Sequence, residues 1–188
     1  MSQAITNKDI HALMIDLDDK DIKVRQHARQ ALTAIGPPAI PQLINALHDP
    51  RDQIRWQSAL ILGHIGDGAA APDLVKSLED KALEVRWRAA ESLADLECQG
   101  LAPLLRTLIQ HPESPWLREG AHHALRIMMV KSDLGELIKP VLKAFDAIEP
   151  TITIPIAAAT ALQKLNQGSL WFNEMRIICN VAFSKFGF

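Results

Sequence analysis

The sequence predicts an all-α fold, a right-handed α-solenoid (superhelix) of about five helical hairpins followed by a C-terminal helix. Three observations predict it: a motif that recurs about every 31 residues, an apolar stripe of helical period in each copy, and a proline that recurs between the copies. A single hairpin of this length cannot bury its apolar face, so the copies are expected to stack on one another.

The recurring motif is an apolar residue followed by arginine. Its first four copies lie 30, 31 and 32 residues apart, and a degenerate fifth follows after 37 more: Val24-Arg25, Ile54-Arg55, Val85-Arg86, Leu117-Arg118 and Ile154-Pro155. With the apolar residue as position 0, position +4 is small and positions +8 and +11 are apolar in every copy. These positions share one face of a 3.6-residue helix, so we expect an amphipathic helix of about four turns in each copy, the Val-Arg helix.

Proline and glycine mark where the helices should begin and end. A second motif between the Val-Arg helices begins at Pro41, Pro72, Pro103 and Pro140. Proline is tolerated in the first turn of a helix, so each hairpin should contain a proline-started helix, a turn and the Val-Arg helix. Glycine at +12, Gly36 and Gly66, should end the first two Val-Arg helices; later copies have Glu97, Met129 and Asn166 there.

Position −5, in the turn before each Val-Arg helix, is acidic in four of the five copies. It holds Asp19, Asp49, Asp80, Pro112 and Glu149. An aspartate before a helix can cap free N–H groups and face the arginine at +1 of its own or a neighbouring repeat. This recurrence favours a structural arginine ladder over a row of phosphate-binding arginines.

We expect one continuous array with repeats at about 8–36, 37–66, 68–97, 99–130 and 134–166, and a capping segment at 168–188. The fourth unit is interrupted at 131–136 and the fifth has Pro155 in place of arginine, so the stack should bend there. The capping segment is apolar on nearly all sides. It should therefore either pack against the array or support self-association.

The second copy carries a family resemblance in Asp49, Ile54-Arg55, Ala59-Leu60, the run Leu62-Gly63-His64-Ile65-Gly66, and Ala71-Pro72-Asp73-Leu74. With parallel residues in the first and third copies, it resembles the HEAT repeat, and more closely the HEAT-like repeats first named for phycobilisome lyases. The resemblance covers about residues 8 to 166. It implies that the proline-containing helices form a convex side and the Val-Arg helices line a concave groove. Such arrays carry out unrelated tasks, so the resemblance implies a fold and no particular function.

Helical geometry predicts which side chains face this groove. At 100° per residue, positions +2, +6 and +9 point away from the core. Trp56 and Trp87 occupy +2 in consecutive copies, about 8 to 10 Å apart, and tryptophan is enriched at binding hot spots. We expect the pair to anchor a partner; alternatively, each indole lies flat across the next helix as packing. The other predicted groove residues are Gln26, Gln30, Leu60, His64, Arg88, Glu91, Asp95, Glu119, His123 and Arg126, and +9 also holds Thr33, Gly63 and Ala94.

The sequence offers no catalytic, cofactor or metal motif. It lacks a Gly-rich phosphate loop, a GxSxG and a Cys-His nucleophile pattern. His122 and His123 diverge by about 100° on a helix, so they cannot share a metal ion. The HEAT-like enzyme deoxyhypusine hydroxylase holds its irons with His-Glu pairs at positions +2 and +3. In this sequence those positions are Gln26-His27, Trp56-Gln57, Trp87-Arg88 and Glu119-Gly120, so none of the pairs is present. We therefore expect no catalytic residues, no cofactor and no metal.

The predicted function is a non-enzymatic scaffold or adaptor that binds a partner protein or peptide in the concave groove. The alternative is a phycobilin-lyase-like subunit or chaperone that handles a tetrapyrrole or its acceptor protein. Absence of tyrosine and isolation of the tryptophans weaken that alternative. A third hypothesis is self-association through 168–188.

Charge and targeting signals narrow the setting. A net charge of −2 and a pI near 6.4 disfavour nucleic acid and anionic lipid as partners. The N-terminus is acidic where a signal peptide would be basic, and no window holds 18 uncharged apolar residues. Cys98 and Cys179 lack paired spacing, which predicts reduced thiols. We expect a soluble, cytoplasmic protein that does not bind membranes.

Overall fold

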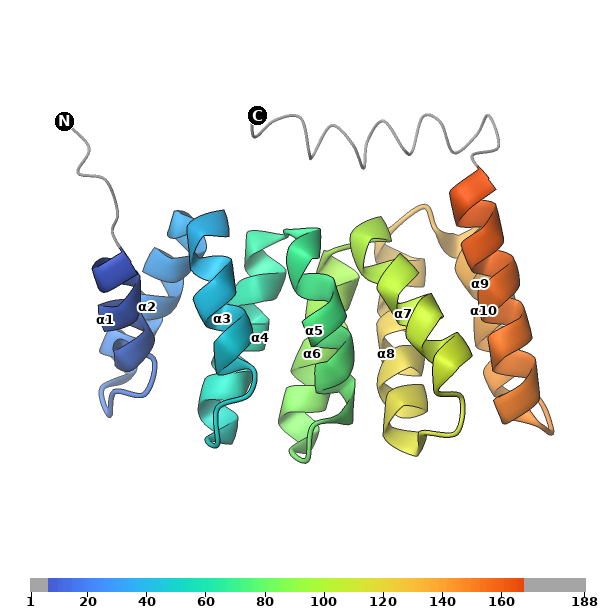
Figure 1. Cartoon of the computed structure of the whole chain (residues 1–188), viewed down its shortest axis with the longest axis horizontal. Helices are drawn as coiled ribbons and strands as arrows, with labels where there is room; N and C mark the ends of the chain where they lie inside the picture. Colours follow the sequence, from blue (N-terminus) through green and yellow to red (C-terminus); the bar gives the residue numbers. More distant parts are fainter. Residues whose placement is uncertain (1–6, 168–188) are drawn as a thin grey trace.

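Helices account for all the regular secondary structure in the part of the chain that the computed structural model describes, residues 7–167. The α-helices are α1 (Asn7–Asp16), α2 (Ile22–Ile35), α3 (Ile40–Ala46), α4 (Asp52–Ile65), α5 (Ala71–Lys76), α6 (Leu83–Asp95), α7 (Cys98–Gln110), α8 (Pro115–Lys131), α9 (Gly135–Phe145) and α10 (Pro150–Gln167). Consecutive helices pair into hairpins that stand side by side (Figure 1). The predicted α-solenoid is confirmed; the capping segment at 168–188 lies outside the described residues.

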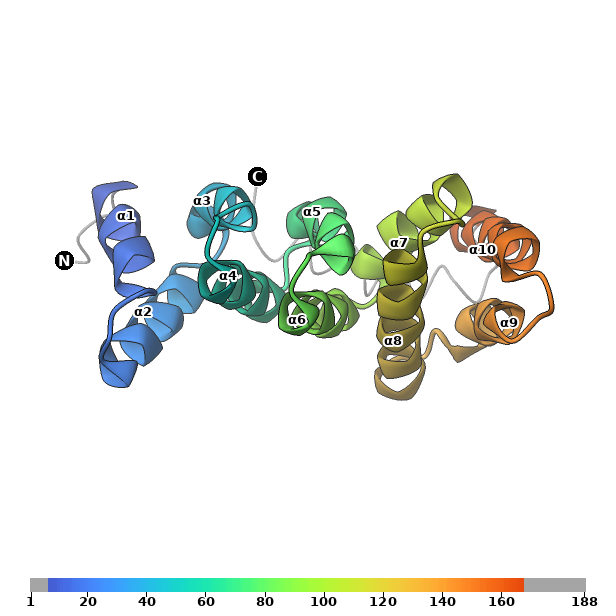
Figure 2. The same ribbon diagram turned by 90° about the horizontal axis from the view of Figure 1, so that it is seen from below.

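The helices form two rows. Figure 2 shows α1, α3, α5, α7 and α10 in one row, here called the outer row, and α2, α4, α6, α8 and α9 in the other, the inner row. The first four Val-Arg helices therefore lie next to one another along one side of the molecule.

The core between the rows is built from the repeated columns. Position +4 is buried in all five copies, and position 0 is buried in every copy except the first, where Val24 is half-buried. All the buried apolar residues of the described part of the chain except Val85 form one cluster, which runs from Ile10 to Ala161. Each hairpin thus covers the apolar stripe of the next, as expected for repeats that cannot bury their apolar faces alone.

Glycine ends two of the inner helices as predicted. Gly36 and Gly66 have φ of 72° and 75°, and their N–H groups donate to the carbonyls of Leu32 and Leu62. Glu97 occupies the same column after α6 and also has a positive φ, of 50°. A side chain in this backbone region is strained, since its Cβ crowds the neighbouring carbonyl.

The prediction of a proline-started helix holds for two hairpins and is wrong for two. Pro41 and Pro72 lie in the first turn of α3 and α5, after the 3-10 turns Pro37–Ala39 and Gly68–Ala70. Pro103 and Pro140 lie inside α7 and α9. The stretch that forms a 3-10 turn in the earlier hairpins is α-helical there, so those helices begin a turn before the proline.

The fifth hairpin reverses the order of its helices, which the repeat pattern did not predict. Here α9 packs against α8 in the inner row, and α10, the fifth Val-Arg helix, packs against α7 in the outer row. Met129 stands where Gly36 and Gly66 end their helices, and α8 continues past it to Lys131. The chain therefore leaves α8 a turn later, and α9 is laid beside it. Only the first four Val-Arg helices can line the inner face.

Two further expectations concern chemistry and setting. Cys98 is disulfide-bonded, so the prediction of a reduced thiol is wrong for this residue; Cys179 lies outside the described residues. Within residues 7–167, no helix is both long and apolar enough to cross a membrane.

Candidate partner-binding face

An arginine ladder holds the turns at the N-terminal ends of the first four Val-Arg helices, α2, α4, α6 and α8. In each of the first four hairpins, Nη1 of the arginine at +1 donates to the main-chain carbonyl at position −5. The distances are 2.7 Å for Arg25 to Asp19, 2.9 Å for Arg55 to Asp49, 2.9 Å for Arg86 to Asp80 and 2.7 Å for Arg118 to Pro112. Because the acceptor is a backbone carbonyl, proline serves at this position as well as aspartate. The prediction of a structural ladder is confirmed.

The acidic side chains at position −5 form a different set of hydrogen bonds, within their own turns. Asp19, Asp49 and Asp80 each accept a hydrogen bond from the N–H two residues later, at 2.7, 2.9 and 2.8 Å. Such a bond fixes the turn that leads into the next helix. The acids are therefore turn-forming residues first, and pairing with arginine is a second contact that only some of them make.

One arginine also pairs with the acid of the next hairpin. Arg55, which is 4% exposed, donates from Nε and Nη2 to the Asp80 carboxylate at 2.6 and 2.8 Å. Burial by itself would raise the pKa of Asp80, but the Arg55 hydrogen bonds and the Ala82 N–H outweigh it and hold that pKa below its ordinary value. The same bonds raise the pKa of Arg55. This ion pair joins two adjacent hairpins and is not available to a ligand.

The two tryptophans at +2 both contact the next inner helix. The Arg88 guanidinium lies 4.7 Å from the centre of the Trp56 ring, and Arg88 also pairs with Glu91 at 2.6 Å. Trp87 and His123 have ring centroids 4.8 Å apart, tilted by 36°. Packing across neighbouring helices thus occurs at both positions. It covers the two indoles unequally: Trp56 is half-buried, whereas Trp87 remains 49% exposed.

None of the twelve predicted groove residues is fully buried. Seven are exposed: Gln26, Gln30, His64, Trp87, Asp95, Glu119 and Arg126. Five are half-buried: Trp56, Leu60, Arg88, Glu91 and His123. Asp95 is paired with Lys131 of α8 at 2.8 Å. All twelve lie on the four inner helices that the first four copies supply.

The predicted orientation of position +9 is wrong for Gly63 and Ala94, which are both buried. A Cβ on Gly63 would lie 2.9 Å from the Cα of Ser92, so α4 and α6 approach each other closely at this point. The neighbouring inner helix covers this flank. An angle measured from the core of one hairpin cannot reveal burial against the next.

A cavity beside Trp56, lined by both polar and apolar side chains, was not predicted from the sequence. The cavity holds about 410 Å³ between α2, α4 and the start of α6, with Arg25, Arg29, Trp56 and Gln57 among its lining residues. Gln57 is fully buried, and Arg29 donates to its Oε1 at 3.0 Å. Arg29 and Gln57 were not predicted as site residues. Their columns, +5 and +3, lie between the core stripe and the groove.

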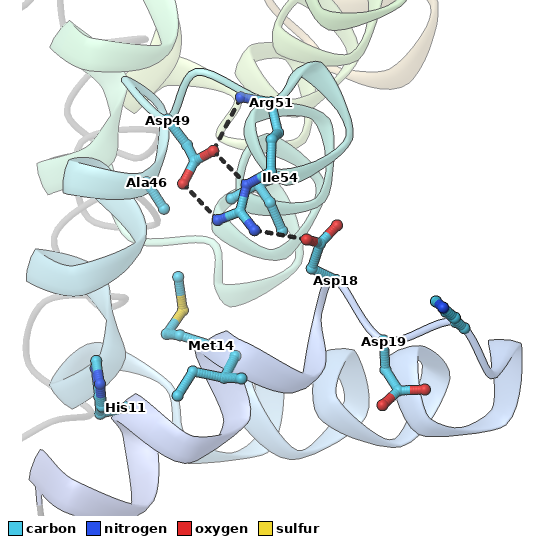
Figure 3. A pocket seen from close by; sticks show the side chains of 10 residues that line it. His11, Met14, Asp18, Asp19, Ala46, Asp49, Arg51 and Ile54 are labelled. Atoms are coloured by element: carbon cyan, nitrogen blue, oxygen red, sulfur yellow. Dashed lines mark hydrogen bonds and ion pairs between the residues drawn. The ribbon is translucent and has the colours of Figure 1, made fainter.

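A larger open cavity of about 620 Å³ lies at the N-terminal end of the array (Figure 3). His11 and Met14 of α1 lie on one side, and Arg51 lies between Asp49 and Asp18 on the other. Arg51 donates to Asp49 at 2.8 Å and to Asp18 at 2.5 Å, and the first of these bonds lowers the pKa of Asp49. The Arg51 cation is therefore neutralised within the cavity by two carboxylates.

The positions of the possible metal ligands were also compared in the described residues. In residues 7–167, no three His, Cys, Asp or Glu side chains gather as a metal site would require. The face formed by the inner row is instead a row of aromatic, amide and charged side chains on a rigid helical frame.

Two rows of stacked helical hairpins, with a continuous core and laddered turns, define a helical-repeat solenoid. The chain belongs to the HEAT-repeat family, since the family model of HEAT repeats matches residues 10–94 and 72–147. The comparison with curated proteins gave no match.

A solved structure shares the fold. A chain of the CpcE–CpcF complex of phycocyanin lyase from Nostoc sp. PCC7120 is similar, with 22% identity, a TM-score of 0.55, and coverage of 83% of this chain and 99% of that chain. A designed armadillo repeat protein matches with 19% identity and a TM-score of 0.39, over 85% of this chain and 83% of that one. At such identities the likeness concerns the fold alone.

Proposed function

We propose that this protein is a binding module that holds a segment of a partner protein along its inner row, with Trp87 and Trp56 as anchors. The observation that carries the proposal is the exposure of Trp87. An indole that is 49% exposed in the middle of the array leaves a large apolar surface in water, although it already stacks on His123. Tryptophan in such a setting is typical of a binding hot spot.

The distribution of other exposed apolar residues supports the inner row as the binding face. Ten large hydrophobic side chains are exposed in the described residues: six lie on inner helices, three on the outer helices α1 and α10, one between α9 and α10, and none on the outer helices α3, α5 and α7. Four lie in the first two turns of inner helices: Ile22, Leu83, Trp87 and Trp116. Together with half-buried Trp56 of α4, these side chains form an apolar strip that follows the N-terminal halves of the inner helices. An extended chain could cross the repeats along that strip.

The electrostatics of the strip favour a mixed, specific contact. Arg88 pairs with Glu91, and Arg86 lies over the Trp116 ring at 5.0 Å and 3.9 Å from Glu119. Because Arg86 and Arg88 are held by the protein's own acids and rings, these two residues do not offer the unpaired positive charge that nucleic acid requires. Apolar contact with a polar rim is the pattern of a protein interface.

The test is a comparison of two double variants. Twelve-residue peptides selected from a random phage-displayed library on the wild-type protein are synthesised, and their Kd values are measured by fluorescence anisotropy. W56A/W87A should weaken binding by roughly 30-fold, the loss typical of a hot spot. I152A/I156A removes two exposed apolar side chains of α10 in the outer row and should change Kd less than about 2-fold. Equal Kd for wild type and W56A/W87A, with unchanged circular dichroism, would sink the proposal.

A second candidate comes from the likeness to the phycocyanin lyase chain, which covers nearly all of that chain. In this reading, the protein handles a tetrapyrrole or the protein that accepts it. Phycocyanobilin is added to the protein, and the visible absorption spectrum is recorded. A shifted, intensified band that W56A/W87A abolishes would favour this candidate; an unchanged spectrum would remove it.

A further inference from the structure

The cavity between α2 and α4 contains hydrogen-bond donors without an anionic partner. Arg25 and Arg29 stand four residues apart on α2 and line the same space. Arg25 donates to the main-chain carbonyls of Asp19 and Lys20, and Arg29 to the Gln57 side chain. Neither forms an ion pair with a carboxylate in residues 7–167, whereas Arg51, Arg55 and Arg88 each do.

The buried amide of Gln57 adds a third donor whose orientation is fixed. A guanidinium can only donate, so the Gln57 oxygen must face Arg29 and the nitrogen must point elsewhere. Gln57 has no exposed surface, and its Nε2 has no acceptor in the described structure. A buried donor without an acceptor is rare in proteins and points to a missing group. Gln57 is one of the residues that line the cavity.

The cavity also contains two acids, Asp52 and Glu84. Both side chains are exposed, and water screens exposed charges, whereas Gln57 is buried and Arg25 and Arg29 are half-buried. The donors therefore dominate the inner part of the cavity, and the acids lie toward solvent. Trp56 and Val85 contribute apolar wall beside the donors. Donors next to an apolar wall fit a carboxylate carried on a carbon chain.

We propose that this cavity binds a carboxylate of the peptide that lies along the inner row, either an acidic side chain or a C-terminal carboxylate. Arg29 and the Gln57 amide nitrogen donate to its oxygens, Arg25 adds positive charge, and the Trp56 ring contacts the attached carbons. The cavity volume of about 410 Å³ is in the range of small-ligand sites. The inference rests on the proposed function and adds the chemical class of one residue of the partner.

Small probes test the inference without a known partner. N-acetyl-leucine carries a terminal carboxylate, N-acetyl-aspartate α-amide carries a side-chain carboxylate, and N-acetyl-leucinamide carries neither. Binding is followed by NMR through the ¹⁵N-labelled Gln57 side-chain amide and the Arg29 Nε–H. At least one carboxylate should bind about 10-fold more tightly than the amide and shift both signals. The tighter of the two identifies the source of the group. Equal binding of all three, or tighter binding of inorganic phosphate, would overturn the inference.

Three variants locate the effect. Gln57→Glu places a carboxylate against Arg29 and should abolish the preference for carboxylate probes; Arg29→Gln should do the same with no new buried charge. Arg106→Gln removes one exposed charge from α7 in the outer row and should leave the preference intact. An equal loss in all three would mean that only net charge matters, and an unchanged preference in Arg29→Gln would refute the site.

Failure of this inference can be told apart from failure of the proposed function. If the selected peptides bind and depend on Trp56 and Trp87 but ignore the loss of their carboxylates, only the inference fails. If the carboxylate probes bind at Gln57 and no peptide depends on the tryptophans, the proposed function fails and the cavity is a site for a small acid.

Discussion

Replacing Asp80 with alanine removes the acid that connects two adjacent hairpins. In the folded protein, Asp80 accepts two hydrogen bonds from buried Arg55 and one from the Ala82 N–H. Arg55 would keep the carbonyls of Asp49 and Pro50, at 2.9 and 3.1 Å, but it would lose the carboxylate with which it forms an ion pair in the described residues. The lost interactions are therefore a turn hydrogen bond and a buried ion pair.

These losses can be separated by a matched variant. Breaking a buried ion pair from one side costs about 3 to 5 kcal/mol, and the two remaining carbonyls place Asp80→Ala near the lower end, at about 3 kcal/mol. Asp19→Ala loses the equivalent turn bond, to Asp21, and no ion pair, so it should cost about 1 kcal/mol. The difference of about 2 kcal/mol belongs to the Arg55 pair.

Urea unfolding followed by far-UV circular dichroism measures both free energies of unfolding, and an unchanged m-value shows that the comparison is valid. If Asp80→Ala and Asp19→Ala differ by less than about 0.5 kcal/mol, the ion pair does not couple the hairpins, and the reasoning is refuted. The pair also predicts a pH dependence. The pKa of Asp80 is lowered from 3.8, so its contribution is complete above pH 3.8 and is lost as the pH falls through the lower folded-state value. The stability gap between wild type and Asp80→Asn should therefore narrow below pH 3.8.

Two predictions concern exchanges between glycine and other residues. Glu97→Gly should stabilise the protein by about 1 kcal/mol, because glycine adopts the positive φ of this residue without strain, and a lower Tm would contradict this. Gly63→Ala should cost about 2 kcal/mol despite the better helix propensity of alanine, since its Cβ would lie 2.9 Å from the Ser92 backbone. Gly135→Ala, at the open start of α9, is the control and should be neutral or stabilising in the same urea titration. Equal stabilities for these two alanine variants would argue against close contact of α4 with α6.

The fold was predictable because its signals are local and repeated. Positions 0, +4 and +8 lie on one face of one helix, and the same types of residue recur at these positions in all five copies. The reversal of the fifth hairpin was not predictable in this way, because it depends on where α8 ends. α8 runs on to Lys131, past the position at which α2, α4 and α6 end, and α9 then packs beside α8. The repeat pattern shows that the array is interrupted at 131–136, but it does not show which row each of the following helices joins.

The candidate site was predictable only in part. Helical angles correctly kept Trp87 and Glu119 out of the core, but they carry no information about the neighbouring hairpin. Contact between neighbours buries Gly63, covers one face of Trp56 with Arg88, and hides Gln57. Side chains between the core stripe and the groove therefore need the three-dimensional structure before they can be assigned.

Photo-crosslinking tests the central claim, binding along the inner row, most directly. Benzoylphenylalanine replaces Trp87 in one protein and Arg106, exposed on the outer helix α7, in another. Both are irradiated with the selected peptide, and adducts are quantified by mass spectrometry. The account predicts adducts from position 87 at about 10-fold or greater excess over position 106. Equal yields, or a higher yield from position 106, would contradict it.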